Sequence, residues 1–323
     1  MSYILLIIGF VLLIKGADIF VEGASKVAKK FGIPAVIVGL TIVSIGTSAP
    51  ELAVSIIASL KGANEITMGN ILGSNIFNTL MVLGITSIIM PIAIKKSTIS
   101  KDFIVSVIVA ILLLVLTFGS FIWGGSPQIS RLSGVILLIL CVAYIVSLII
   151  AAKNSNESNN DIENEEPKEE VKILTCIIKI LIGITGVVFG GQMVVDSATS
   201  IATAFGMSQK LIGLTIVAVG TSLPELVTSM MAAIKGENDI ALGNVLGSNI
   251  FNMLLILGTS STISPIAVAP QLGIDLIFLI IVTLILGAFM FTGKNGESKL
   301  SKKEGIILVL IYIAYVVYIV MRN

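Results

Sequence analysis

Ten apolar segments make up most of this chain, and each is close to the roughly 20 residues that a helix needs to cross a bilayer. They lie at about 3–23, 34–60, 66–90, 103–122, 132–152, 173–195, 209–234, 240–264, 275–292 and 305–321. Only 12% of the 323 residues are charged, about half of the roughly 25% usual in soluble proteins. The sequence therefore predicts an all-α membrane protein with ten transmembrane helices and excludes a soluble enzyme.

Composition removes several further classes of function. The chain has no histidine, so imidazole bases, His–metal sites and His proton relays are excluded. Its two cysteines, Cys141 and Cys176, lie in apolar runs and are interpreted as core residues rather than as a disulfide or metal pair. A net charge of +1 gives no sign of nucleic-acid binding. We expect no cofactor.

The two halves of the chain repeat each other. A constant offset of 174 aligns residues 31–94 with 205–268 without a gap, and 36 of those 64 positions are identical. The first half contains GTSAPEL and GNILGSNIFN, and the second contains GTSLPEL and GNVLGSNIFN. The sequence thus predicts two five-helix repeats, at 1–152 and 173–323, joined by an acidic linker at 153–172.

An odd number of helices in each repeat predicts that the second repeat lies inverted relative to the first. The loops support this prediction, because those rich in lysine in one repeat correspond to loops poor in lysine in the other. Lysine and arginine collect in cytoplasmic loops. We therefore expect both termini outside the cytoplasm and the acidic linker inside it.

Glu51 and Glu225 are the acidic residues nearest the centres of their predicted helices, and the offset of 174 makes them equivalent. A charge at mid-membrane costs roughly 2.5–3.5 kcal/mol on insertion scales. Two such carboxylates in matching motifs predict a shared site near the midplane. The alternative is a pair of protonated, hydrogen-bonded glutamates that hold two helices together.

The residues around each glutamate suggest how the site would bind a cation. Pro50 and Pro224 have no N–H, so each frees the carbonyl four residues earlier and predicts a broken helix. Hydroxyl groups three and four residues before each glutamate share its helix face. These hydroxyls belong to Thr47, Ser48, Thr221 and Ser222. Carboxylate, hydroxyl and free carbonyl oxygens are ligands for hard cations such as Na⁺ and Ca²⁺.

The third and eighth segments supply a facing surface. Polar residues spaced by four form one stripe on each: Asn70, Ser74 and Asn78, and then Asn244, Ser248 and Asn252. Their alternative role is hydrogen bonding between helices. This alternative is favoured more for Asn70, Asn75, Asn244 and Asn249 than for the other polar residues of these segments. Glycines beside the stripes, Gly69 and Gly73 with Gly243 and Gly247, predict close helix packing.

The paired GTSxPE and GNxLGSNIFN motifs resemble the two alpha-repeats of the cation/calcium exchanger superfamily, with most similarity to prokaryotic sodium/calcium exchangers. The resemblance covers nearly the whole chain. It implies a multi-pass protein of a prokaryotic plasma membrane that exchanges Na⁺ for Ca²⁺ by alternating access and functions as a monomer. It also implies four ion sites between the second, third, seventh and eighth helices, with the first and sixth helices sliding across them.

The resemblance assigns the ligands residue by residue. Carboxylates, hydroxyls and amides would come from Glu51, Glu225, Thr47, Ser48, Thr221, Ser222, Ser74, Ser248, Asn78 and Asn252, and backbone carbonyls from Ser44 and Ala218.

Other functions stay open on the residues alone. A proton-coupled calcium antiporter would use the same glutamates, and a cation channel would also need intramembrane carboxylates. An intramembrane enzyme lacks candidate residues. The remaining membrane charges are Asp18, Glu22, Asp196, Lys15 and Lys179. Their positions toward helix ends favour structural or entrance roles, including an ion pair between Lys15 and Asp18.

Potassium-dependent relatives carry aspartate where this chain has Asn252, so we predict Na⁺-driven Ca²⁺ flux that does not need K⁺. Replacing K⁺ with choline should leave ⁴⁵Ca²⁺ uptake into proteoliposomes unchanged. Asn252→Asp adds a negative charge, which favours an extra cation or a bound proton. We expect this variant to change ion stoichiometry or pH dependence and to keep the fold. Collapse of wild-type flux without K⁺ would instead place the chain with the potassium-dependent relatives.

Overall fold

The computed structural model describes residues 2–61, 64–119, 125–159, 172–206, 218–291 and 298–322. Within these ranges, eight helices are long and apolar enough to cross a membrane, and a bent helix pair makes a ninth candidate. The predicted all-helical membrane fold is confirmed at this level. The predicted segment 209–234 lies partly outside the described residues, and its described part contains the apolar helix α12 (Leu223–Ile234).

Six of the spanning helices are continuous. They are α1 (Ser2–Phe31), α7 (Lys96–Phe118), α8 (Arg131–Asn159), α9 (Ile173–Ala204), α15 (Gln271–Phe291) and α16 (Lys302–Arg322). The helix α8 therefore continues seven residues beyond the predicted end at 152, and residues 160–171 of the predicted linker lie outside the described residues.

Two further spans contain a π-helical turn. One consists of α5 (Asn64–Phe77), η2 (Asn78–Val82) and α6 (Leu83–Ile89). The other consists of α13 (Asn238–Phe251), η5 (Asn252–Ile256) and α14 (Leu257–Ile263). The two π-turns begin at equivalent positions of the repeat, since 78 and 252 differ by 174. Single π-turns inside helices often occur at functional sites, because the extra residue re-aims the side chains around it.

The second span is broken where its proline predicts. It runs through α2 (Ala35–Val38), the π-turn η1 (Gly39–Val43) and α3 (Ser44–Thr47), then turns by 49° into α4 (Ala49–Leu60). Ser48, at the break, has a ψ of 7°, and Pro50 lies in the first turn of α4, where its missing N–H removes no helical bond. The same break separates α11 (Ala218–Gly220) from α12, with Ser222 at a ψ of 6° and Pro224 just beyond it.

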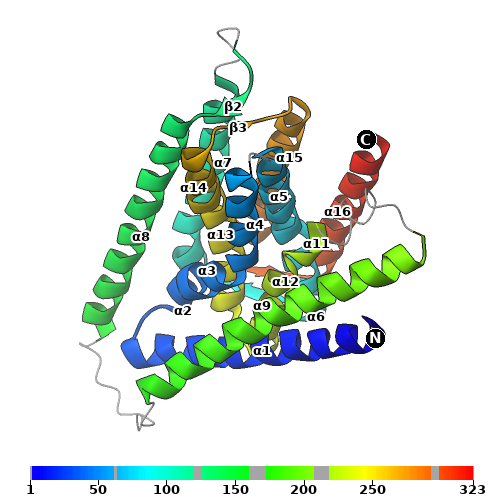
Figure 1. The fold of residues 1–323 in the computed structure, drawn as a ribbon. Helices are drawn as coiled ribbons and strands as arrows, with labels where there is room; N and C mark the ends of the chain where they lie inside the picture. The colour runs from blue at the N-terminus through cyan, green and yellow to red at the C-terminus, as the bar shows by residue number, and fades with distance from the viewer. Residues whose placement is uncertain are drawn as a thin grey trace.

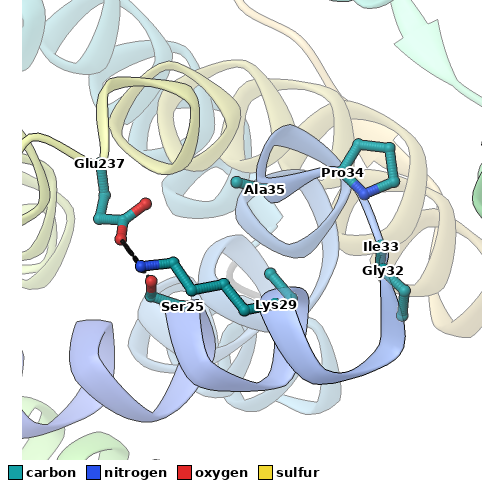
Figure 2. Close-up of a pocket in the computed structure, with 8 residues that line it drawn as sticks. Ser25, Lys29, Gly32, Ile33, Pro34, Ala35 and Glu237 are labelled. Carbon is teal, nitrogen blue, oxygen red and sulfur yellow. Dashed lines mark hydrogen bonds and ion pairs between the residues drawn. The ribbon is translucent and has the colours of Figure 1, made fainter. Parts of the chain in front are cut away.

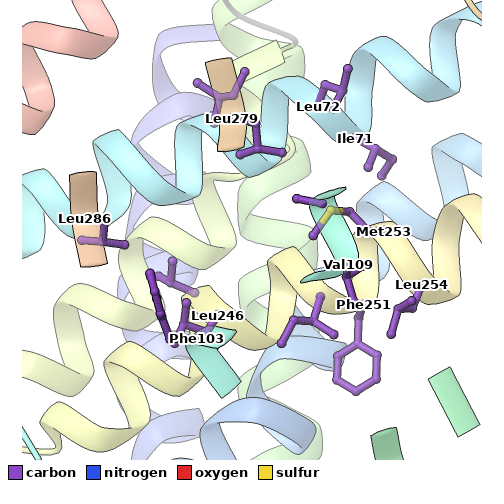
Figure 3. Packing of buried hydrophobic residues seen from close by; sticks show 14 of the residues in the cluster. Ile71, Leu72, Phe103, Val109, Leu246, Phe251, Met253, Leu254, Leu279 and Leu286 are labelled. Atoms are coloured by element: carbon purple, nitrogen blue, oxygen red, sulfur yellow. The ribbon is translucent and has the colours of Figure 1, made fainter. Parts of the chain in front are cut away.

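The helix α13 lies at the centre of the molecule (Figure 1). Every residue from Ile240 to Phe251 is buried, although the stretch includes two asparagines and a serine. Its apolar side chains pack with those of α5, α7, η5 and α15, among others, as Figure 3 shows for Ile71, Val109, Leu246 and Leu279. Apart from the half-buried Asn70, the polar stripes of the sequence therefore lie inside an apolar shell rather than on the surface.

The helices α1 and α9 form a pair that packs across the rest of the protein (Figure 1). They contain 30 and 32 residues, which is about 45 Å of helix and more than the roughly 30 Å hydrocarbon core, so each is long enough to cross a membrane at a tilt. Glycines let their backbones touch, since a Cβ on Gly183 would lie 2.6 Å from the Cα of Phe20. Small apolar clusters, separate from the main core, join this pair to the neighbouring helices.

Two short antiparallel strand pairs tie the connections together. The strand β1 (Ile92–Ile94) pairs with β4 (Ser298–Leu300), and β2 (Gln128–Ile129) pairs with β3 (Ile266–Ala267). The strands β1 and β2 precede and follow the single helix α7. The strands β1 and β3 are equivalent in the repeat. Because β3 pairs with β2, it belongs with the connection after α7, whereas β1 lies in the connection before α7.

These pairs generate a prediction about topology. In a background with Cys141→Ala and Cys176→Ala, a membrane-impermeant maleimide should label Ser97→Cys only from the cytoplasm. It should label Ser126→Cys and Gln271→Cys only from outside, because those residues flank the β2–β3 pair. Ser97, Ser126 and Gln271 are all exposed, so the maleimide can reach each position. Labelling of Ser97→Cys and Gln271→Cys from the same side would contradict the inverted arrangement.

Candidate cation-binding site

The two membrane carboxylates meet across the repeats at the two helix breaks. Glu51, in the first turn of α4, and Glu225, in the first turn of α12, are 1% and 0% exposed. The hydroxyl of Ser48 donates to Oε1 of Glu225 over 3.0 Å, and the hydroxyl of Ser222 donates to Oε1 of Glu51 over 3.2 Å. Each broken helix therefore supplies a donor to the carboxylate of the other.

The long helices add one donor to each carboxylate. Ser74 of α5 donates to Oε1 of Glu51 over 3.4 Å, and Ser248 of α13 donates to Oε1 of Glu225 over 3.5 Å. The four predicted serine hydroxyls thus all reach a carboxylate, and all of them reach the same oxygen of it. The second oxygen of each glutamate is left without a hydrogen-bond partner.

Three other predicted ligands also have a buried oxygen without a hydrogen-bond partner. The buried polar atoms without a partner include Oε2 of Glu51, Oε2 of Glu225, Oδ1 of Asn78, Oδ1 of Asn252 and Oγ1 of Thr221. All five belong to residues that the sequence predicted as ligands. A buried acceptor without a partner costs free energy, and a buried carboxylate costs the most. A positive charge shared by these oxygens would stabilise the arrangement.

The remaining predicted ligands are already hydrogen-bonded. The hydroxyl of Thr47 donates to Oδ1 of Asn244 over 3.0 Å. The carbonyl of Ser44 accepts from the hydroxyl of Ser248 over 3.5 Å and from the backbone N–H of Ser48. Ala218 begins α11, just before the second break. The structure therefore brings four of the predicted serines to the two glutamates, and Ser44 and Ala218 lie on the short helices before the two breaks.

A network of asparagines crosses from α5 to α13 beside the site. Asn75 and Asn249, which are equivalent in the repeat, each donate to the other's backbone carbonyl, over 3.2 and 3.5 Å. Asn244 donates to the hydroxyl of Ser229 over 2.9 Å. The predicted hydrogen bonding between helices is therefore present for these residues. Sequence reasoning left Asn75 and Asn249 out of the site, and their equivalent positions beside the stripe were the signal available.

Glycines bring the broken second span against α13. A Cβ on Gly247 would lie 2.7 Å from the carbonyl oxygen of Leu40, and one on Gly243 would lie 2.6 Å from that of Val36. Close packing at these two glycines is confirmed. The close packing predicted at their equivalents is not found in the described part of the chain, since apart from their own helix no described atom lies within 4 Å of a Cβ added to Gly69 or Gly73.

The other membrane charges are satisfied away from the site. Asp18 pairs with Lys235 over 2.8 Å, in place of the predicted Lys15, because the turn after α12 brings Lys235 against α1. Asp196 is exposed and accepts from the amide of Gln192 over 2.8 Å.

Polar contacts also join α1 to its neighbours at its C-terminal end. Glu22 pairs with Lys179 of α9 over 2.6 Å. Figure 2 shows Lys29 of α1 directed at Glu237, in the turn after α12, with the two charged groups 3.5 Å apart. Ser25 donates to the same carboxylate. These charges hold helices together and do not reach the two central glutamates.

The chemistry of the site favours a hard cation. In the described part of the chain, no group of three or more His, Cys, Asp or Glu side chains could hold a metal ion. Among the buried atoms without a partner, those of the predicted ligands are two carboxylate oxygens, two amide oxygens and one hydroxyl oxygen. Oxygen-only ligand sets with few charges suit Na⁺ and Ca²⁺ and do not suit soft transition metals.

Comparison with known proteins agrees with this chemistry. The sequence profile of a family described as sodium/calcium exchanger protein matches residues 1–150 and 176–321. The chain belongs to this family. The resemblance predicted from the paired motifs is therefore confirmed for this exchanger-family protein.

Relatives of this exchanger-family protein cover almost its full length. It is 36% identical over 317 residues to the putative antiporter CaxA of Alkalimonas amylolytica, covering 97% of this chain and 96% of that protein. It is 32% identical to the sodium/calcium exchanger MaX1 of Methanosarcina acetivorans, covering 98% and 97%. The solved structure of the sodium-calcium exchanger NCX_Mj, soaked with 2.5 mM Na⁺ and 0.1 mM Ca²⁺, matches with a TM-score of 0.81 at 32% identity.

Proposed function

We propose that this protein is a secondary antiporter that exchanges Na⁺ for Ca²⁺ across a prokaryotic plasma membrane. The observation that carries the proposal is the set of buried oxygens without partners around Glu51 and Glu225. Membership of the sodium/calcium exchanger family supports the choice of ions. So do the names of MaX1 and NCX_Mj.

Charge explains why the two ions would exclude one another. The two carboxylates carry a formal charge of −2 when ionised, which one Ca²⁺ neutralises. Sodium ions can neutralise the same oxygens instead, and like charges in a low-dielectric site repel strongly. A site that holds either load but not both couples the two fluxes.

The ligands of the transported ions are assigned to the oxygens around the two helix breaks. The proposed set is the one predicted from the motifs: Glu51, Glu225, Thr47, Ser48, Thr221, Ser222, Ser74, Ser248, Asn78, Asn252, and the carbonyls of Ser44 and Ala218. Five of these supply the unpaired oxygens. The hydroxyls that now donate to Oε1 of a glutamate can turn their oxygen toward an ion, since a hydroxyl rotates freely.

Alternating access would come from two inverted five-helix repeats, 1–152 and 173–323, that complete ten spans. The strand pairs support inversion. The strands β1 and β3 are equivalent in the repeat, but β1 directly precedes α7, whereas β3 pairs with β2, which follows α7. The lysine-rich connections beside β1 and β4 favour a cytoplasmic position for that end, which would leave both termini outside. The α1–α9 pair, joined to the rest by small separate clusters, is the part suited to move.

The test is ⁴⁵Ca²⁺ uptake by purified protein in liposomes under an imposed outward Na⁺ gradient. Uptake driven by the Na⁺ gradient is expected, and a pH gradient of the same size should not replace it. Uptake driven only by the pH gradient would assign the protein to proton-coupled antiport. Uptake without either gradient, at channel-like rates, would rule out exchange.

Glu51→Gln and Glu225→Gln should each abolish Ca²⁺ transport and leave the protein folded. Glutamine keeps Oε1 as the acceptor for the serine hydroxyls and puts an NH₂ group where the unpaired Oε2 lies. The variant therefore keeps the native hydrogen bonds and loses both the charge and one ligand. Transport is measured in liposomes, and folding by size-exclusion elution and Tm.

Asp196→Asn is the matched control, since it also neutralises a membrane carboxylate but lies on the exposed side of α9. It should keep transport. Substantial Ca²⁺ uptake by either glutamine variant would overturn the two-carboxylate site.

A further inference from the structure

We infer that Asn75 and Asn249 are positioning residues that fix the amide orientation of Asn252 and Asn78, so that both of those amides turn an oxygen toward the transported ion. Oδ1 of Asn75 accepts from Nδ2 of Asn252 over 2.9 Å. Oδ1 of Asn249 accepts from Nδ2 of Asn78 over 3.2 Å. The inference rests on the proposed function, because it concerns ligands of the same site.

The orientation matters because an asparagine amide has one accepting end and one donating end. With Nδ2 bound to the opposite helix, the oxygens of Asn78 and Asn252 are the free ends, and both are buried without a partner. A half-turn of either amide would instead present an NH₂ group to the ion and repel it. The hydrogen bond at Nδ2 thus decides whether Asn78 or Asn252 presents an oxygen ligand or a repelling NH₂ group to the ion.

The two positioning residues cannot turn over together with their partners. Nδ2 of Asn75 donates to the backbone carbonyl of Asn249 over 3.2 Å. Nδ2 of Asn249 donates to the backbone carbonyl of Asn75 over 3.5 Å and to the hydroxyl of Thr79 over 2.9 Å. A backbone carbonyl can only accept. The chain of bonds therefore ends on groups with a fixed role, and every amide in it has one allowed orientation.

Burial makes this arrangement persistent. Asn75 and Asn249 are 0% and 3% exposed. Solvent therefore cannot replace a lost hydrogen-bond partner, and leaving an amide unpaired in the interior costs free energy of folding. A purely structural role, holding α5 against α13, would need only the bonds to the backbone. It would not need the two bonds that reach specifically to Asn252 and Asn78.

The pairing is crossed, and this gives a specific test. Asn75 serves Asn252 and does not serve Asn78, although Asn78 lies on its own helix. In a double-mutant cycle, residues that act through one another show non-additive effects, whereas independent residues show additive ones. Loss of a residue that orients a metal ligand commonly costs about 10- to 100-fold in affinity or activity.

The experiment measures the KM for Ca²⁺ and the maximal rate of Na⁺-driven ⁴⁵Ca²⁺ uptake in liposomes. Asn75→Ala and Asn252→Ala should each raise the KM about tenfold, and the double variant should be no worse than the poorer single one. Combining Asn75→Ala with Asn78→Ala should multiply the two effects. The mirror cycle pairs Asn249→Ala with Asn78→Ala.

Ile76→Ala is the control for damage to the packing of α5. Ile76 is fully buried in the apolar core next to Asn75 in the chain, and this change leaves every hydrogen bond of the asparagine network in place. We expect its KM to stay near that of the wild type. A rise equal to that of Asn75→Ala would reduce the asparagines to packing residues and overturn the inference.

The remaining outcomes are separable. Additive effects for Asn75 with Asn252, and for Asn249 with Asn78, would overturn the positioning role and leave the proposed exchange intact. Absence of Na⁺-driven uptake by the wild-type protein would overturn the proposed function, and the inference with it. If Asn75→Ala does not fold, as judged by size-exclusion elution, the mirror cycle on Asn249 decides the question.

Discussion

Two carboxylates buried together in the interior of a membrane protein constrain everything around them. Glu51 and Glu225 have almost no contact with solvent, and each has one oxygen held by serines and one without a partner. Removing a charge from water costs more than any single hydrogen bond returns. The fold provides donors for one oxygen of each carboxylate and leaves the other unpaired, and this second oxygen is where the proposed cation would bind.

The helix breaks are what bring those donors into place. Ser48 and Ser222 lie at the two breaks, each next to its own glutamate in sequence, yet each donates across to the other glutamate. A continuous helix would point the hydroxyl and the carboxylate along one face of the same helix. The 49° bend and the proline beyond it let the two spans exchange donors, which locks the repeats together at the site.

The dry environment comes from the helices that cross behind the breaks. The helix α13 is buried from Ile240 to Phe251, and an apolar shell from its neighbouring elements surrounds it. Inside such a shell an asparagine keeps whichever hydrogen bonds the packing gives it. The crossed bonds of Asn75 and Asn249 are an example, since the same side chains facing water would reorient freely. Packing thus turns four chemically identical amides into two that hold and two that face the site.

Much of this architecture followed from local properties of the sequence. Hydropathy located the spans, Pro50 and Pro224 located the breaks, and the offset of 174 showed that Glu51 and Glu225 belong together. The spans and the breaks depend on residues close in the chain, over the range at which backbone chemistry acts, whereas the equivalence of the two glutamates came from the repeated motifs. The π-turns at Asn78 and Asn252 had no such signal, because an extra residue in a helical turn is decided by what packs against it.

Pairings between distant residues were decided only by the tertiary structure. The sequence predicted Lys15 as the partner of Asp18, three residues apart, but the turn after α12 brings Lys235 to it instead. It likewise marked Asn75 and Asn252 as polar and equivalent to Asn249 and Asn78, without showing which amide would hold which. Amide orientation depends on the register of two crossing helices 177 residues apart in the chain, and no local pattern encodes that register.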